Sequence, residues 1–294
     1  MNLKLVMLAA LVAAAFPAAA QQDASKHRDP LFTEIAPGDI SSDPANLIAG
    51  AQKGDVRAIN NLGLLWARGV GVPAPDFKEA MRWWKEAAKR GYTVSMNNLG
   101  LLYASGHGVA QDYAQAFKWW EMSAEGGDPW AMNSIGDLYE NGQGVEQNYA
   151  LALEWYQRAA DAGDGLALYN LGHLHEVGLG VERNAKAAFG WYERSADQGV
   201  ALSMSMLGRM LAEGRGVPAD AAEAHAWMSI AQGYFTAEDA KDAEANARTL
   251  AALTASLSVQ QMARSREIAA NLQARIEERR KQRPLQLGPD ESDT

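Results

Sequence analysis

The sequence predicts an all-α protein, a right-handed α-solenoid of about five antiparallel helix-pair repeats with a helical cap at each end. Two recurring features support this fold. A glycine after Leu or Ile recurs in steps of 37, 36, 36 and 36 residues, at Gly63, Gly100, Gly136, Gly172 and Gly208. A tryptophan recurs every 36 residues, at Trp83, Trp119, Trp155, Trp191 and Trp227. Such a period indicates stacked units that bury a continuous core only against their neighbours.

Each unit is expected to contain two helices. The units span 55–91, 92–127, 128–163, 164–199 and 200–235. The first helix should end at a Gly-x-Gly-Val turn, because glycine adopts the left-handed backbone that caps a helix. The second should begin at a good N-cap residue: Asp76, Asp112, Asn148, Asn184 or Asp220.

The first 20 residues predict export. Lys4 precedes an apolar run from Leu5 to Phe16, and small residues lead to Ala20. This is the layout of a secretory signal, and the run is too short to span a membrane. We therefore expect cleavage near Ala20 and a periplasmic or secreted protein. The chain has no cysteine, so a lipid anchor at the cleavage site and disulfides are excluded.

The two ends should cover the repeats. We expect a flexible leader over residues 21–42 and a half-repeat helix over 43–54. Residues 236–282 should form a C-terminal helical cap of two or three helices, with Thr236 and Ser258 as N-caps, and residues 283–294 a disordered tail. The stretch 264–283 has seven Lys or Arg and three Glu, a net charge of 7 − 3 = +4. It is interpreted either as a docking site for an acidic partner or membrane surface, or as a solvated helical face.

The recurring tryptophan predicts a packing site rather than a box for an aromatic or cationic ligand. Small residues lie three before and four after it, as Ala80 and Ala87 do around Trp83, on one helical stripe. The next position is also large in every unit, reading Trp, Trp, Tyr, Tyr and Met. We therefore expect Trp119→Ala to cost about 3–5 kcal/mol of stability.

The repeated patterns A..WW..AA..G and NLG.LY..G.GV..DY resemble the Sel-one-like repeat family, a relative of the tetratricopeptide repeat. The resemblance covers five consecutive units. It implies a scaffold or adaptor in protein complexes, often in bacterial envelopes, and it implies no reaction. Cysteine-rich relatives suggest an alternative, a hydrolase acting on cell-wall or β-lactam-like substrates.

Partner-binding residues are expected where the repeat positions vary, because such positions carry no shared packing role. They lie three before, one after and four after the recurring glycine, a face that the resemblance places on the inner curve. We expect contacts from Asn60, Leu64, Asn97, Leu101, Asn133, Asp137, Glu140, Tyr169, His173, Glu176 and Arg209. The asparagines either clamp a peptide backbone, since an amide both donates and accepts, or lie on a solvated face.

The expected partners are proteins or peptides of the cell envelope. Removal of Lys4 with the signal changes the net charge from −9 to −9 − 1 = −10, which argues against nucleic acid. No later stretch is apolar enough to make an integral membrane protein. No cofactor is expected, and the familiar hydrolase and nucleotide motifs do not occur, so we expect no enzyme.

Two other site chemistries remain open. If adjacent units stack, a metal or a hydrolytic water could be held by Asp137, Glu140, His173 and Glu176, whereas His175 takes an aromatic packing slot. A peptidoglycan- or polysaccharide-binding module would instead use exposed rings, for which the candidates are Trp84, Trp130 and Tyr169.

Overall fold

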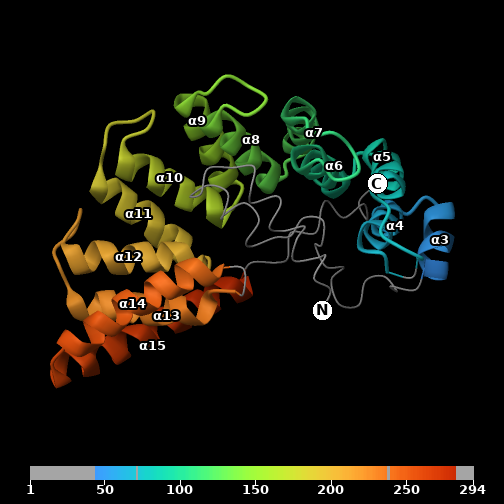
Figure 1. The fold of residues 1–294 in the computed structure, drawn as a ribbon. Helices are drawn as coiled ribbons and strands as arrows, with labels where there is room; N and C mark the ends of the chain where they lie inside the picture. Colours follow the sequence, from blue (N-terminus) through green and yellow to red (C-terminus); the bar gives the residue numbers. More distant parts are fainter. Residues whose placement is uncertain (1–43, 71, 237–238, 283–294) are drawn as a thin grey trace. The chain divides into compact units, whose positions relative to one another are not determined.

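The computed structural model describes residues 44–70, 72–236 and 239–282, and every regular element in them is a helix, α3 to α15 (Figure 1). The predicted all-α repeat fold is confirmed. The segments expected to be the signal peptide, the leader and the tail all lie outside these residues. The contacts divide the chain into two compact units, one ending at Ala162 and the other beginning at Gly163.

Unit 1 contains one single helix and three helix pairs. The single helix is α3 (Pro44–Gln52), and the pairs are α4 (Val56–Arg68) with α5 (Phe77–Ala88), α6 (Thr93–Ser105) with α7 (Tyr113–Glu125), and α8 (Pro129–Asn141) with α9 (Tyr149–Asp161). Within the unit, each helix packs against the next one along the chain. In Figure 1, α4, α6 and α8 lie on one side of the unit and α5, α7 and α9 on the other.

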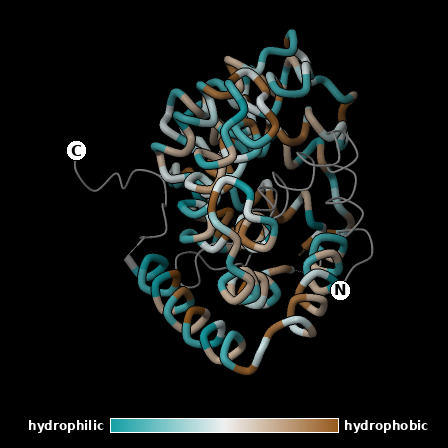
Figure 2. Tube along the Cα trace, turned by 90° about the vertical axis from the view of Figure 1, so that its left-hand side faces the viewer, coloured by the Kyte–Doolittle hydropathy of each residue, from teal (hydrophilic) through white to brown (hydrophobic). Residues whose placement is uncertain are grey.

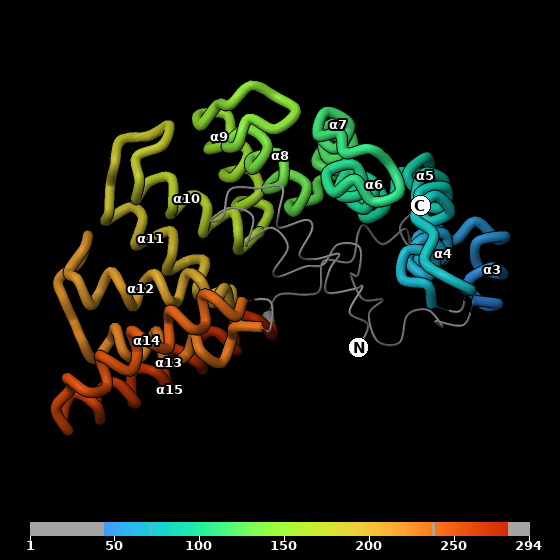
Figure 3. The backbone as a smooth tube through the Cα atoms, in the orientation of Figure 1, coloured from blue at the N-terminus to red at the C-terminus, as the bar shows by residue number. Residues whose placement is uncertain are grey.

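Unit 2 contains two helix pairs followed by two cap helices. The pairs are α10 (Gly165–Val177) with α11 (Ala185–Ala196) and α12 (Ala201–Glu213) with α13 (Ala221–Tyr234), and the cap helices are α14 (Ala240–Ser256) and α15 (Val259–Gln282). Both cap helices pack against α13. Figure 3 follows the backbone through these successive hairpins.

The turn between the two helices of a pair has the predicted chemistry. The first helix ends in every pair at a glycine with left-handed backbone, as at Gly106, where φ is 73°. The second helix begins in every pair at the predicted N-cap, whose side chain accepts a hydrogen bond from a backbone N–H of the first turn. In the second pair Asp112 accepts from Gln115 N at 3.0 Å. The glycine and the Asp or Asn of each turn therefore determine where the first helix ends and the second begins.

The recurring glycine makes room for the large residue that directly follows the recurring tryptophan. A Cβ added at Gly100 would lie under 3.0 Å from the ring of Trp120, and the other four glycines face their partners in the same way. The five large side chains are all fully buried: Trp84, Trp120, Tyr156, Tyr192 and Met228. Close contact between the two helices of a pair therefore requires glycine at this position.

The recurring tryptophan itself is not the main core residue, which corrects the prediction. Trp83, Trp119, Trp155 and Trp191 are only half-buried, and only Trp227 is buried. The offsets in the sequence fit both adjacent positions equally well. Trp83 lies three after Ala80 and four before Ala87, and Trp84 lies four after Ala80 and three before Ala87. Both spacings place a residue on the helical stripe of the alanines, so the sequence could not show which of the two is buried. Three of the half-buried rings lie beneath arginines, those of Trp83, Trp155 and Trp191, with the guanidinium carbon of Arg158 3.9 Å from the centre of the Trp155 ring.

A second set of glycines joins one repeat to the one before it. A Cβ added at Gly108, in the α6–α7 turn, would lie 2.6 Å from the Cβ of Phe77 at the start of α5. Gly144 meets the start of α7 in the same way, and Gly216 the start of α11. The turn of each of these repeats therefore lies directly on the preceding repeat's second helix, and a side chain there would separate them.

The C-terminal cap is held to unit 2 by polar contacts. His225 on α13 is buried, and its ring nitrogens lie 2.8 Å from Ser265 Oγ on α15 and 3.0 Å from Thr254 Oγ1 on α14. The predicted N-cap at Ser258 is confirmed, since it exchanges hydrogen bonds with Gln261. Thr236 does not cap α14, which begins after Asp239.

The basic stretch of α15 is largely used within the chain. Figure 2 shows mostly hydrophilic residues along the helix that leads to the C-terminus. Arg264 forms an ion pair with Asp220 at 2.7 Å, and both Arg275 and Arg279 pair with the buried Asp197, at 2.7 and 3.2 Å. These arginines attach the cap to the repeats, so the interpretation of the stretch as merely a solvated face does not describe them.

Candidate functional site

The predicted partner-binding residues divide into a buried and an accessible group. Asn60, Leu64, Asn97, Leu101, Asn133 and Asp137 are buried. Glu140, Tyr169, His173 and Glu176 are half-buried, and Arg209 is exposed. Four of these five accessible residues belong to unit 2. We call them the α10–α12 face: Tyr169, His173 and Glu176 on α10, and Arg209 on α12.

The asparagines do not lie on a solvated face, so that interpretation is wrong. Asn60, Asn97 and Asn133 are 3%, 5% and 1% exposed. The side-chain oxygen of Asn60 accepts from Ser95 Oγ at 2.8 Å and from Asn98 Nδ2 at 3.2 Å, both on the next repeat. In the first pair the asparagine therefore joins neighbouring repeats, because a buried amide must satisfy its hydrogen-bonding groups inside the protein.

A tyrosine and a carboxylate recur at equivalent positions of the third and fourth repeats. In unit 1, Tyr156 Oη lies 2.7 Å from both Asp137 Oδ1 and Glu140 Oε2. In unit 2, Tyr192 Oη donates to Glu176 Oε2 at 2.7 Å. Burial, together with the nearby carboxylates, raises the pKa of both phenols well above the ordinary value, so both remain protonated donors.

The four-residue acidic cluster considered as a metal site falls in two different units, with Asp137 and Glu140 in one and His173 and Glu176 in the other. Within the described ranges there is no group of three or more His, Cys, Asp or Glu residues arranged to hold a metal ion. His175 packs as predicted, because its ring stacks on that of Trp191 with centres 6.3 Å apart and planes 19° apart. Burial lowers the pKa of His175.

The rings considered as a glycan platform are mostly inaccessible. Trp84 and Trp130 are 0% and 3% exposed, and only Tyr169 is partly accessible. Trp130 instead packs edge-on against Trp120, with ring centres 5.6 Å apart. The three rings therefore provide no common surface on which a sugar ring could stack.

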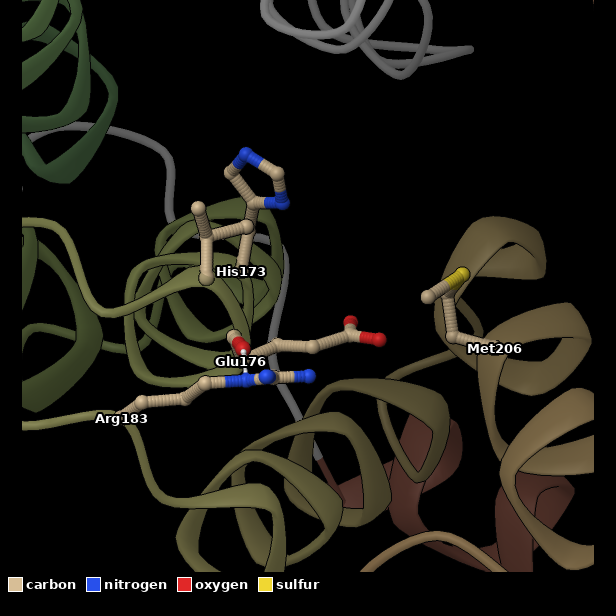
Figure 4. Close-up of a pocket in the computed structure, with 5 residues that line it drawn as sticks. His173, Glu176, Arg183 and Met206 are labelled. Carbon is tan, nitrogen blue, oxygen red and sulfur yellow. Dashed lines mark hydrogen bonds between the residues drawn. The ribbon is translucent and has the colours of Figure 1, made fainter. Parts of the chain in front are cut away.

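The α10–α12 face contains an open pocket of about 400 Å³ (Figure 4). Its lining comes from three places in unit 2: His173, Glu176 and Val177 on α10, Arg183 in the α10–α11 turn, and Met206 on α12. In Figure 4, Arg183 runs alongside Glu176, and Met206 faces them from the neighbouring repeat.

Hydrogen bonds and an ion pair hold the polar side of this pocket in place. Arg183 Nε donates to the backbone oxygen of Glu176 at 2.9 Å. The carboxylate of Glu176 accepts from the phenol of Tyr192 and pairs with Arg215, which also pairs with Glu213. The carboxylate of Glu176, which lines the pocket, is therefore compensated within the protein.

Sequence reasoning missed three of the five pocket residues, namely Val177, Arg183 and Met206. A signal existed for Met206, which lies two before the recurring glycine. The other four repeats have asparagine or serine at this position, reading Asn61, Asn98, Ser134 and Asn170. Those four residues are buried and polar, whereas Met206 is apolar and half-buried, so the fifth repeat departs from the pattern at this position.

A family model named Sel1 repeat matches five consecutive segments, residues 56–92, 93–128, 131–164, 165–200 and 201–231. The chain belongs to the Sel1 repeat family. Sel1 repeat proteins generally mediate protein–protein interactions, and their fold is typically a non-catalytic scaffold. The predicted family is thus confirmed.

Two solved structures of Sel1-type proteins are similar to this chain. The Sel1 repeat protein from Oxalobacter formigenes is 30% identical with a TM-score of 0.60, over 67% of this chain and 81% of that one. A protective antigen present in uropathogenic Escherichia coli strains, which has an SLR fold, is 29% identical with a TM-score of 0.61, over 95% of this chain and 65% of that one. No curated protein matches this Sel1 repeat chain. None of the helices in the described residues has the length and hydrophobicity to cross a membrane.

Proposed function

We propose that this Sel1 repeat protein is a non-enzymatic scaffold of the bacterial cell envelope, which binds protein or peptide partners through the accessible face of its first helices. One observation carries the proposal. The core positions are large and buried in all five repeats, whereas the accessible positions read Glu, Tyr, His, Glu and Arg. A surface that varies on a constant framework is what partner recognition requires.

Unit 2 is the main contact region in this proposal. It holds four of the five accessible residues and the pocket beside them. The buried residues Asn60, Asn97 and Asn133 are assigned to the framework instead. The envelope location rests on the export signal predicted for residues 1–20 and agrees with the similar Escherichia coli chain being a protective antigen.

In-cell crosslinking tests the proposal. The full chain and the variant His173→Glu/Arg209→Glu, which reverses charge on the α10–α12 face, are crosslinked in the cells that produce them, and captured proteins are identified by mass spectrometry. The control is Arg248→Glu, at an exposed position of α14. We expect envelope proteins that the control retains and the double variant loses. Identical capture by all three proteins would refute the assigned face, and capture of cytoplasmic proteins alone would refute the location.

A further inference from the structure

We infer that the pocket on the α10–α12 face anchors an extended segment of a partner protein in which an aspartate or glutamate follows a large apolar side chain. The inference rests on the proposed function and specifies the chemistry of the partner. It follows from two features, an apolar wall in the pocket and positive charge that no acid in the described ranges compensates, on Arg183 in the pocket lining and on Arg209 of the same face.

Val177 and Met206 provide the apolar wall. Val177 is 49% exposed, which makes it one of the few large apolar side chains at the surface among the described residues. Met206 is half-buried and faces the pocket from the next repeat (Figure 4). A methionine adapts its shape to different apolar partners. A volume of about 400 Å³ lies at the small end of ligand pockets, so it suits one or two side chains rather than a folded surface.

The positive charge comes from Arg183 and Arg209. Arg183 is oriented by its hydrogen bond to Glu176 O, and Arg209 lies one helical turn after Met206 on the same side of α12. Among the described residues, neither arginine forms an ion pair with an acid, whereas Glu176 and Glu213 share Arg215. The charges of Arg183, Arg209, Arg215, Glu176 and Glu213 therefore sum to 3 − 2 = +1, on a chain whose net charge is −9.

This combination selects for an acidic residue beside an apolar one. A guanidinium binds a carboxylate through two parallel hydrogen bonds, a geometry that a lysine in place of the arginine could not reproduce. The pocket is open, so a chain can enter and leave it, and an internal side chain fits better than a chain end. The neighbouring Tyr169 and His173 offer rings against which the peptide backbone can lie.

Fluorescence polarisation of a defined peptide tests the inference. The probe is Ser-Gly-Phe-Glu-Leu-Glu-Gly-Ser, labelled with fluorescein at its N-terminus and amidated at its C-terminus, and it is titrated with the full chain. Two control peptides replace both glutamates by glutamine, or both apolar residues by serine. We expect saturable binding of the probe, binding weaker by tenfold or more for each control peptide, and a loss of affinity at higher salt.

Protein variants assign the binding to the pocket. Arg209→Gln changes an exposed residue and should weaken binding about tenfold, a loss of about 1.4 kcal/mol. Met206→Gln should weaken binding of the probe but not of the serine-substituted peptide, and Arg248→Gln on α14 should change neither. Thermal unfolding of each variant confirms that it is folded.

Three results would overturn the inference: no saturable binding of the probe, equal binding of the glutamine peptide, or binding that Arg209→Gln leaves unchanged. A version of the probe that ends in a free Leu carboxylate and binds far more tightly would show that the pocket takes a chain end instead. If crosslinked partners depend on the α10–α12 face but the peptide does not bind, the proposed function stands and this inference fails.

Discussion

In the second repeat, two adjacent tryptophans of helix α7 have different structural roles. Trp120 lies against Gly100 with 1% of its surface exposed, whereas Trp119 is half-buried at the side of α7. The sequence has a large residue at both positions in every repeat, so it cannot show which of the two is buried between the helices of a pair. The distinction depends on the rotation of the second helix about its axis, and a shift of one residue corresponds to about 100°.

We expect Trp120→Ala to cost about 3–5 kcal/mol of unfolding free energy, because it removes a fully buried ring and leaves a cavity against Gly100. Trp119→Ala should cost about 1 kcal/mol, since its side chain is already partly in contact with water. Urea unfolding of the two variants under the same conditions provides the comparison. Equal costs would mean that both rings contribute equally to the core.

We expect Gly172→Ala to destabilise the protein by about 1–3 kcal/mol, because the new Cβ would lie 2.6 Å from the ring of Tyr192. The matched control is Gly190→Ala on α11 of the same repeat, where a Cβ meets nothing within 4 Å. This control should stabilise the protein by up to about 1 kcal/mol, as alanine favours helix over glycine. The midpoint of unfolding should shift in opposite directions for the two variants. A shift in the same direction would contradict the tight contact between Gly172 and Tyr192.

At the scale of elements, the cap helices are attached through a buried histidine. His225 contacts α14 and α15 through its two ring nitrogens, and the arginines of α15 pair with acids at the ends of α11 and α13. Two cap helices could be predicted from composition and the Ser258 capping pattern. Their docking could not, because it depends on single hydrogen bonds between residues 29 and 40 apart in the chain.

Acidification should loosen this attachment. Burial, and secondarily the positive charge of Arg266, lowers the pKa of His225 below its ordinary value of 6.5. Above that value the ring is neutral in both states, so stability is independent of its titration. As the pH falls below 6.5, the unfolded chain binds the proton first, and stability declines until the folded-state pKa is reached.

The difference in unfolding free energy between about pH 7.5 and about pH 5.5 measures this effect, and His225→Gln should show a smaller decline than the unchanged chain. The pKa values of His107 and His175 are also lowered by burial, but both residues are present in both proteins, so the comparison isolates His225. Equal declines would show that the cap does not respond to protonation of this residue.

At the scale of the whole molecule, the chain consists of two compact units whose repeats contact mainly their neighbours. The 36-residue period predicted the helices, their caps and the turns, because each depends on local chemistry that repeats. It did not predict which face is accessible. Asn60 and Met206 show why. Their exposure depends on how one repeat is rotated relative to the next, and the sequence period does not specify this rotation.

We expect a core substitution to act mainly within its own unit. Tyr156→Ala should reduce hydrogen-exchange protection of amides in unit 1, and Tyr192→Ala that of amides in unit 2, because the two buried tyrosines occupy equivalent positions on either side of the boundary. Hydrogen exchange followed by mass spectrometry compares the two variants. If each substitution lowered protection equally in both units, the chain would unfold as one cooperative body.

In the described residues, a turn glycine of one repeat can lie against the second helix of the repeat before it, and we call this contact a glycine joint. Such joints affect how the chain can change its length. Gly108 and Gly144 each lie on the start of the second helix of the repeat before. The second repeat holds both Gly108 and the start of α7 that Gly144 meets, so it carries both halves of the joint. A duplicated block of 36 residues would therefore find a matching surface on each side without any new complementary substitution. Whole repeats can be gained or lost in evolution at this joint, and the recognition surface lengthens or shortens with them.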